Sequence, residues 1–297
     1  MNARKALWGT LIGTIIIFVP SASSAKSKTA GTSNVDRELL RRSNITIPVH
    51  IYNGFLVVAT GQIGGQTHNF VLDTGTAPSI LNERSLEKLA LPLTPASIVA
   101  VGRNISTQQT VLPNLDIGPI HVSALPINVM DLSGLEKNLG IEVAGLLGMD
   151  VLARSSFRLD YEKKQLDFGP VAQYGTRVSY DPSTGLASAE ATLQGTQVRL
   201  IVDTGTDLVV VYGDKWATFG SVTPASDQEG SSVAERVPAK PIAHPELALG
   251  GHQFSGVRTY YVPSAGQTPY DGFFGVRALK LRGISFDRET QTLFLLN

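Results

Sequence analysis

The chain has 297 residues, of which 42% are apolar, so it can bury a hydrophobic core as one large domain or two small ones. Its 25 basic residues balance 25 acidic ones without a long run of either sign, which argues against a nucleic-acid-binding protein. Because the sequence contains no cysteine, it excludes disulfides, thiolate chemistry and cysteine-bearing metal sites.

The first 25 residues have the layout of an export signal. Arg4 and Lys5 precede an apolar run from residue 7 to 19, and small residues follow up to Ala25, where we expect cleavage. A membrane anchor formed by an uncleaved N-terminus is the alternative, but the run is shorter than the ~20 residues of a spanning helix. We expect a secreted or periplasmic protein with no membrane span after cleavage.

Residues 26–45 are rich in small polar side chains and lack apolar periodicity, which predicts a flexible linker and leaves open whether it is a propeptide. From Ile45 onward, short runs of Val, Ile, Leu and Thr alternate with Gly, Pro and Asn, a pattern typical of strands and turns. Only two short helices are predicted, at residues 84–91 with Asn82 as the cap and at residues 214–219. The fold class is therefore all-β with few short helices.

An internal repeat organises this β-rich region. Residues 63–81 align without gaps with residues 193–211, at an offset of 203 − 73 = 130. A second stretch, residues 145–168, aligns with residues 272–295 at an offset of 287 − 160 = 127. The landmarks follow the same order in both halves, so the chain contains two diverged copies of one β unit.

Two copies are too few for a solenoid, and they predict two lobes that face each other across a pseudo-twofold axis. The boundary should fall in the Pro-, Gly- and Ser-containing stretch 170–185. We expect an N-terminal β lobe at residues 46–170 and a C-terminal β lobe at residues 171–297, each of normal domain size.

The same tetrapeptide, Asp-Thr-Gly-Thr, ends an apolar strand in each copy of the repeat. Asp73 and Asp203 are thereby placed at the ends of buried strands, as the candidate catalytic residues. The glycines permit a tight turn and a close approach of the two loops, and the threonines offer hydroxyls for bonds across the axis and to the carboxylates. These supporting residues are Thr74, Gly75 and Thr76 in the first copy and Thr204, Gly205 and Thr206 in the second. The alternative is that both motifs are turns in which Asp caps its own backbone.

From about residue 46 to the C-terminus, the sequence resembles the aspartic protease superfamily, and within it the bacterial retropepsin-like and pepsin-like proteins. The resemblance rests on the two Asp-Thr-Gly-Thr motifs and on Leu146-Leu147-Gly148 and Phe273-Phe274-Gly275, which in the family thread behind the catalytic loops. It implies the bilobal acid protease fold and an aspartic endopeptidase that hydrolyses a polypeptide held in the interlobe cleft. No cofactor or metal is implied, and a monomer suffices because one chain supplies both lobes.

Electrostatics then predict the mechanism. Two carboxylates ~3 Å apart cannot both ionise, so Asp73 and Asp203 would share one proton, and the ionised partner would activate a water. The sequence does not assign separate acid and base roles to the two. Because four threonine hydroxyls near the pair should stabilise negative charge, we expect an acid-side pH optimum.

The sequence departs from the pepsin pattern in the hairpin that closes over the substrate. Pepsin-like enzymes carry a tyrosine there, whereas no tyrosine occurs between Thr76 and Asp160. We expect the flap at residues 98–112, with Gly102, Arg103 and Asn104 at its tip, and a second flap at residues 222–237 around Gly230.

Two other functions remain open. A secreted non-catalytic peptide-binding module could retain this fold, although the presence of both aspartates and both glycines argues against it. A glycoside hydrolase would need two carboxylates in unlike environments, whereas the repeat predicts similar ones. The five histidines show no metal-ligand spacing, and no Gly-x-Ser-x-Gly motif occurs.

Overall fold

The computed structural model describes residues 11–12, 44–100, 103–212, 228–231, 236–242, 245–262 and 268–297. Strands predominate in this part of the chain, which confirms the all-β fold class. Its helical elements are α2 (Glu83–Leu89), α3 (Ser133–Leu139), α4 (Met149–Leu152) and the 3-10 turn η2 (Arg277–Leu279). No helix in the described ranges is long and apolar enough to cross a bilayer.

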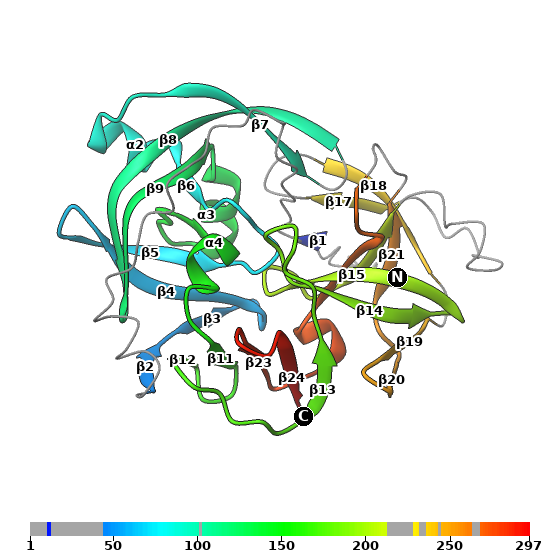
Figure 1. Cartoon of the computed structure of the whole chain (residues 1–297). Coiled ribbons are helices and arrows are strands. Elements are labelled where there is room, and N and C mark those ends of the chain that lie inside the picture. Colours follow the sequence, from blue (N-terminus) through cyan, green and yellow to red (C-terminus); the bar gives the residue numbers. More distant parts are fainter. Residues whose placement is uncertain are drawn as a thin grey trace, which may run out of the picture.

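The first lobe is built on an eight-stranded sheet with the order β3-β4-β5-β10-β6-β9-β8-β7 (Figure 1). In that order the strands are β3 (His50–Tyr52), β4 (Leu56–Ile63), β5 (Gln66–Leu72), β10 (Gly145–Leu147), β6 (Ile80–Asn82), β9 (Ile120–Met130), β8 (Arg103–Ile117) and β7 (Thr94–Ala100). β10 runs parallel to β5 and antiparallel to β6, so it fills the space between the strand before the first Asp-Thr-Gly motif and the strand after it.

The second lobe is built on a ten-stranded sheet with the order β1-β17-β18-β21-β16-β22-β15-β14-β19-β20. Its strands are β1 (Leu11–Ile12), β17 (Gln228–Ser231), β18 (Arg236–Pro241), β21 (Thr259–Val262), β16 (Val209–Tyr212), β22 (Gly272–Gly275), β15 (Thr196–Asp203), β14 (Ser188–Leu193), β19 (Glu246–Leu249) and β20 (His252–Ser255). β1 lies inside the predicted export signal, so of the described strands cleavage after Ala25 would remove this edge strand alone.

Both lobes follow one plan. The run β4-β5-β10-β6-β9-β8-β7 in the first sheet matches β14-β15-β22-β16-β21-β18-β17 in the second. The two sheets differ next to β4 and its counterpart β14. β14 pairs with β19 of the β19–β20 hairpin, whereas β4 pairs with the long β8 at Gln62 and Asp116. The sequence repeat is therefore a structural repeat.

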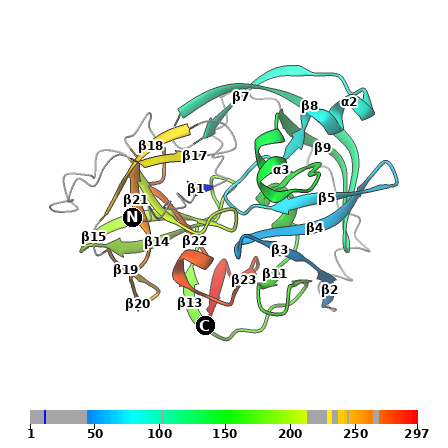
Figure 2. The same cartoon turned by 180° about the vertical axis from the view of Figure 1, so that it is seen from behind.

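A six-stranded sheet joins the two halves of the chain below both lobes (Figures 1 and 2). Its order is β13 (Thr176–Ser179), β24 (Thr292–Leu296), β23 (Gly283–Asp287), β11 (Phe157–Asp160), β12 (Gln165–Phe168) and β2 (Ile45–Pro48). Reading outward from the centre, β11, β12 and β2 of the first half correspond to β23, β24 and β13 of the second.

The central pairing of that sheet shows the twofold relation directly. Arg158 of β11 lies opposite Ser285 of β23, and the repeat offset, 285 − 158 = 127, makes these two residues equivalents of one another. Phe157 pairs with Phe286 on one side, and their rings stack at 4.5 Å. The axis that relates the lobes therefore passes between β11 and β23.

The helix predictions were partly correct. The helix expected at 84–91 is α2, and Asn82 occupies its N-cap position. The side chain makes no capping bond, because Asn82 Oδ1 accepts from the Leu132 N–H at 3.4 Å and its amide donates to the Val143 carbonyl at 2.9 Å. The helix expected at 214–219 lies outside the described residues. α3 and α4 were not predicted.

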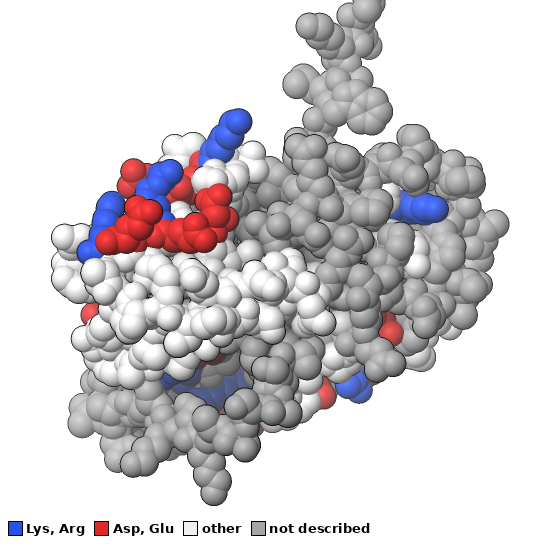
Figure 3. Space-filling model, turned by 90° about the horizontal axis from the view of Figure 1, so that it is seen from above, with Lys and Arg blue, Asp and Glu red and all other residues white. Residues whose placement is uncertain are grey.

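Charge on the described surface is mixed. On the face seen in Figure 3, acidic and basic side chains lie interspersed in one cluster on the first lobe. This distribution agrees with the balanced composition, and the described residues of that cluster offer no broad basic surface to a polyanion.

Candidate active site

The two Asp-Thr-Gly loops meet where β5 and β15 end. Asp73 follows β5, and its N–H donates to the Leu147 carbonyl of β10 at 2.9 Å. Asp203 is the last residue of β15 and lies opposite Gly275 of the parallel strand β22. β10 and β22 thus lie directly behind the two loops, as the family resemblance implied. Their backbone pairing holds Asp73 and Asp203 in place at the ends of β5 and β15.

Thr74 and Thr204 lock the loops together. The Thr74 N–H donates to Thr204 Oγ1 at 3.1 Å, and the Thr204 N–H donates to Thr74 Oγ1 at 3.1 Å. Each hydroxyl then donates to a carbonyl of the opposite lobe, Thr74 to Val202 at 2.7 Å and Thr204 to Leu72 at 2.8 Å. All four bonds are buried, so the lobes are held in register at the catalytic loops.

The two carboxyl groups lie in direct contact and are fully buried. A Cβ atom at Gly75 would lie 2.6 Å from Asp203 Cγ, and one at Gly205 would lie 2.9 Å from Asp73 Cγ. Both separations are shorter than carbon atoms tolerate. Glycine is therefore required at both positions because each carboxyl group packs against the backbone of the opposite loop.

Hydrogen bonding distinguishes the two aspartates. Asp73 Oδ1 accepts from the Gly75 N–H at 2.9 Å, and Asp73 Oδ2 accepts from Thr76 Oγ1 at 2.8 Å. Asp203 Oδ1 accepts from the Gly205 N–H at 2.6 Å, but no N–H or hydroxyl donor of the described residues reaches Asp203 Oδ2. The symmetry of the motifs is broken at the carboxylates.

The difference arises at the second threonine of each motif. Thr206 Oγ1 accepts a hydrogen bond from the Leu208 N–H at 3.3 Å and makes no bond to Asp203 among the described residues. The expectation that Thr76 and Thr206 both donate to the carboxylates therefore holds for Thr76 only.

Burial raises the pKa of both carboxyl groups. The pKa of Asp73 rises to about 6 because burial outweighs the hydrogen bonds from Thr76, Asp203 and Gly75. The pKa of Asp203 rises well above its ordinary value because of burial and, in second place, the neighbouring Asp73 charge. Two hydrogen bonds stabilise a negative charge on Asp73 and one stabilises it on Asp203, so Asp73 is the better placed of the coupled pair to carry the charge.

The expected flap tips are only partly described. β7 and β8 form a hairpin with Ala100 opposite Arg103 and Val99 opposite Asn104, while Gly102 lies outside the described residues. β17 and β18 form a second hairpin in which Gly230 lies opposite Val237. Closure of either hairpin over a substrate stays a prediction.

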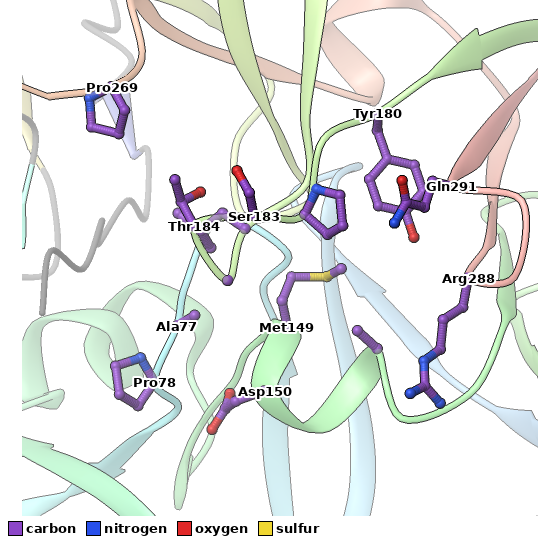
Figure 4. Close-up of a pocket in the computed structure, with 14 residues that line it drawn as sticks. Ala77, Pro78, Met149, Asp150, Tyr180, Ser183, Thr184, Pro269, Arg288 and Gln291 are labelled. Carbon is purple, nitrogen blue, oxygen red and sulfur yellow. The ribbon is translucent and has the colours of Figure 1, made fainter. Parts of the chain in front are cut away.

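A cavity of about 750 Å³ adjoins the first catalytic loop, lined by residues of both halves of the chain (Figure 4). Ala77, Pro78 and Met149 line it from the first half, and Pro182 and Leu186 from the second. No sequence pattern predicts this cavity, because its walls come from segments far apart in the chain. Elsewhere in the described ranges, no cluster of three or more His, Cys, Asp or Glu residues could hold a metal ion.

Two lobes that bring paired Asp-Thr-Gly loops to a common twofold axis define the class of bilobal acid proteases. The sequence profile of the aspartyl protease family matches residues 59–151 and again residues 189–278, and the chain belongs to this family. The first match runs from β4 into α4 and the second from β14 into η2, so each covers one copy of the repeat. No curated protein matches the sequence.

Proposed function

We propose that the protein is an aspartic endopeptidase whose catalytic residues are Asp73 and Asp203. The observation that carries this proposal is the contact between two buried carboxyl groups, one from each repeat, with raised pKa values. Such a pair holds a single proton over a broad pH range, which is the state needed for acid and base catalysis together.

The unequal hydrogen bonding supports a division of roles between the two aspartates. Asp73, with two donors, is the carboxylate that takes a proton from the attacking water, whose oxygen bonds to the scissile carbonyl carbon. Asp203 gives its proton to the carbonyl oxygen, which yields a gem-diol. Asp73 then passes its new proton to the leaving amine while a diol hydroxyl returns a proton to Asp203, and the C–N bond breaks.

The raised pKa values support a working range for this pair above that of ordinary carboxylates. kcat/KM should rise as the pH passes about 6, where Asp73 ionises, and fall when Asp203 loses its proton at higher pH. Burial thus moves the expected optimum from the acid side toward neutrality.

The family supports a polypeptide as the substrate, bound across the two lobes beside the paired aspartates. The layout of residues 1–25 supports export to the periplasm or the medium, with anchoring by an uncleaved N-terminus as the alternative. A single chain supplies both aspartates, so we propose a monomer.

A secreted peptide-binding module without turnover is the second candidate. It would keep the fold and the loops but would not cleave what it binds. One experiment separates the two functions: digestion of a peptide library by the wild type beside Asp73→Asn and Asp203→Asn.

We expect cleavage by the wild type, inhibition by a statine-type transition-state mimic, and loss of cleavage in both variants. Full activity in either variant would show that the two aspartates are not the catalytic pair. Peptide binding by the wild type without cleavage would establish the binding module.

A further inference from the structure

The segment from Thr76 to Ser79 is clamped at both ends by residues 148–150. The Met149 N–H donates to the Thr76 carbonyl at 2.9 Å, and the Gly148 N–H donates to Ser79 Oγ at 2.9 Å. Asp150 Oδ1 accepts from both the Ser79 N–H, at 3.0 Å, and Ser79 Oγ, at 2.7 Å. Thr76, the residue that donates to Asp73, is therefore the first residue of a fixed four-residue segment.

Burying the Ser79–Asp150 pair lowers the stability of the fold. Ser79 is fully buried, and Asp150 Oδ2 is buried without a hydrogen-bond partner among the described residues. Burial also raises the pKa of Asp150 despite the bonds from Ser79. A buried oxygen without a hydrogen-bond partner destabilises a fold, so the presence of Asp150 at this position needs an explanation other than stability.

The second repeat has no such pair. The equivalents of Ser79 and Asp150 are Val209 (79 + 130) and Arg277 (150 + 127). The Arg277 guanidinium donates to the Gly54 carbonyl at 3.1 Å and to the Leu281 carbonyl at 2.6 Å, away from its own catalytic loop.

The asymmetry of the clamp matches the asymmetry of the catalytic pair. Where Ser79 and Asp150 hold the segment, Thr76 Oγ1 donates to Asp73 Oδ2 at 2.8 Å. In the second repeat, where the clamp is absent, Thr206 Oγ1 accepts from the Leu208 N–H, a donor that the equivalent Pro78 (208 − 130) lacks, and Asp203 Oδ2 has no N–H or hydroxyl donor among the described residues.

We propose that Ser79 and Asp150 are positioning residues that hold the Thr76 hydroxyl on Asp73 and thereby make Asp73 the base of the pair. Neither residue touches the reacting atoms, and both act through Thr76. The inference rests on the proposed function, because a base has a role only if the pair hydrolyses peptides. A clamp that is present in one repeat and absent from the other makes the two identical Asp-Thr-Gly-Thr motifs unequal.

The test is the pH dependence of kcat/KM for peptide cleavage. Thr76→Val removes a hydrogen bond to an ionised carboxylate, so the acid limb should move up by about one to two pH units. Ser79→Ala and Asp150→Ala should move the acid limb in the same direction by a smaller amount, with KM unchanged within about twofold. Asp150→Asn, which keeps an acceptor for Ser79, should give a profile close to the wild type.

A double variant tests the route of the effect. Ser79→Ala in the Thr76→Val background should move the acid limb no further, because the hydroxyl that the clamp positions is already gone. Thr292→Val is the matched control: it removes another buried hydroxyl, bonded to the Thr290 carbonyl at 3.2 Å, far from the pair in β24. It should leave the pH profile unchanged.

An unmoved acid limb in folded Ser79→Ala and Asp150→Ala would overturn the inference, as would an additive shift in the double variant. If Ser79→Ala does not fold, the comparison of Asp150→Ala with Asp150→Asn decides the matter. Absence of cleavage by the wild type would instead refute the proposed function, so the two failures are distinguishable.

Discussion

Thr74→Val should destabilise the whole fold, because the Thr74 hydroxyl serves two buried backbone groups of the second lobe. Without it, the Val202 carbonyl loses its 2.7 Å donor and the Thr204 N–H loses its 3.1 Å acceptor. Leaving a buried polar group unpaired costs about 1–3 kcal/mol, so the two together predict a loss of about 2–6 kcal/mol in the free energy of unfolding. Valine has nearly the same shape, so packing contributes little to the change.

Denaturant unfolding followed by tryptophan fluorescence or circular dichroism measures this loss as a lower midpoint at unchanged slope. Thr74→Ser keeps the hydroxyl and should lose much less stability. Thr292→Val loses one local bond and should cost about 1 kcal/mol. A loss below about 1 kcal/mol for Thr74→Val would refute the reasoning, because it would mean that the bonds between the catalytic loops do not hold the lobes together.

Three further changes have defined outcomes. Asp73→Asn should be more stable than the wild type at pH 7, by up to about 3 kcal/mol, and equal to it near pH 3.5. The native wild type binds the Asp73 proton more tightly than the unfolded chain does, so it loses stability as the pH rises from about 4 to about 6. Curves of unfolding free energy against pH that run parallel for the two proteins would contradict this. Gly75→Ala should lower kcat by about 100-fold or more, since its Cβ would displace the Asp203 carboxyl group, and kcat near the wild-type value would show that the loops can separate without loss. Arg277→Gln should lower the free energy of unfolding by about 1–3 kcal/mol, since its guanidinium bonds the Gly54 carbonyl of the other lobe, and equal stability by denaturant titration would count against that bond.

The sequence predicted the features that depend on local pattern and on repetition. Two gap-free repeat segments and a shared motif were enough to predict the family, the all-β class, and Asp73 and Asp203 as partners. A short helix from residue 84 was also foreseen, since Leu86 and Leu89 are spaced to bury one face.

What the sequence missed depends on tertiary contacts. α4 is only four residues long and begins at Met149, whose N–H bonds the Thr76 carbonyl, so it forms where a distant loop supplies a partner. Ser79 and Asp150 are 71 residues apart, and no spacing rule links them. The unequal hydrogen bonding of the aspartates was hidden because the two motifs are identical in sequence.

The pairing of β11 with β23 has a consequence for the timing of activity. β11 ends at residue 160, whereas β23 begins only at residue 283, so nearly half of the chain is synthesised between the two partners. Until the last strands have been made, β11 presents an open edge and the second Asp-Thr-Gly loop lacks β22 behind it. A nascent chain that has not yet formed β22 and β23 therefore carries both aspartates but cannot assemble the proposed catalytic pair.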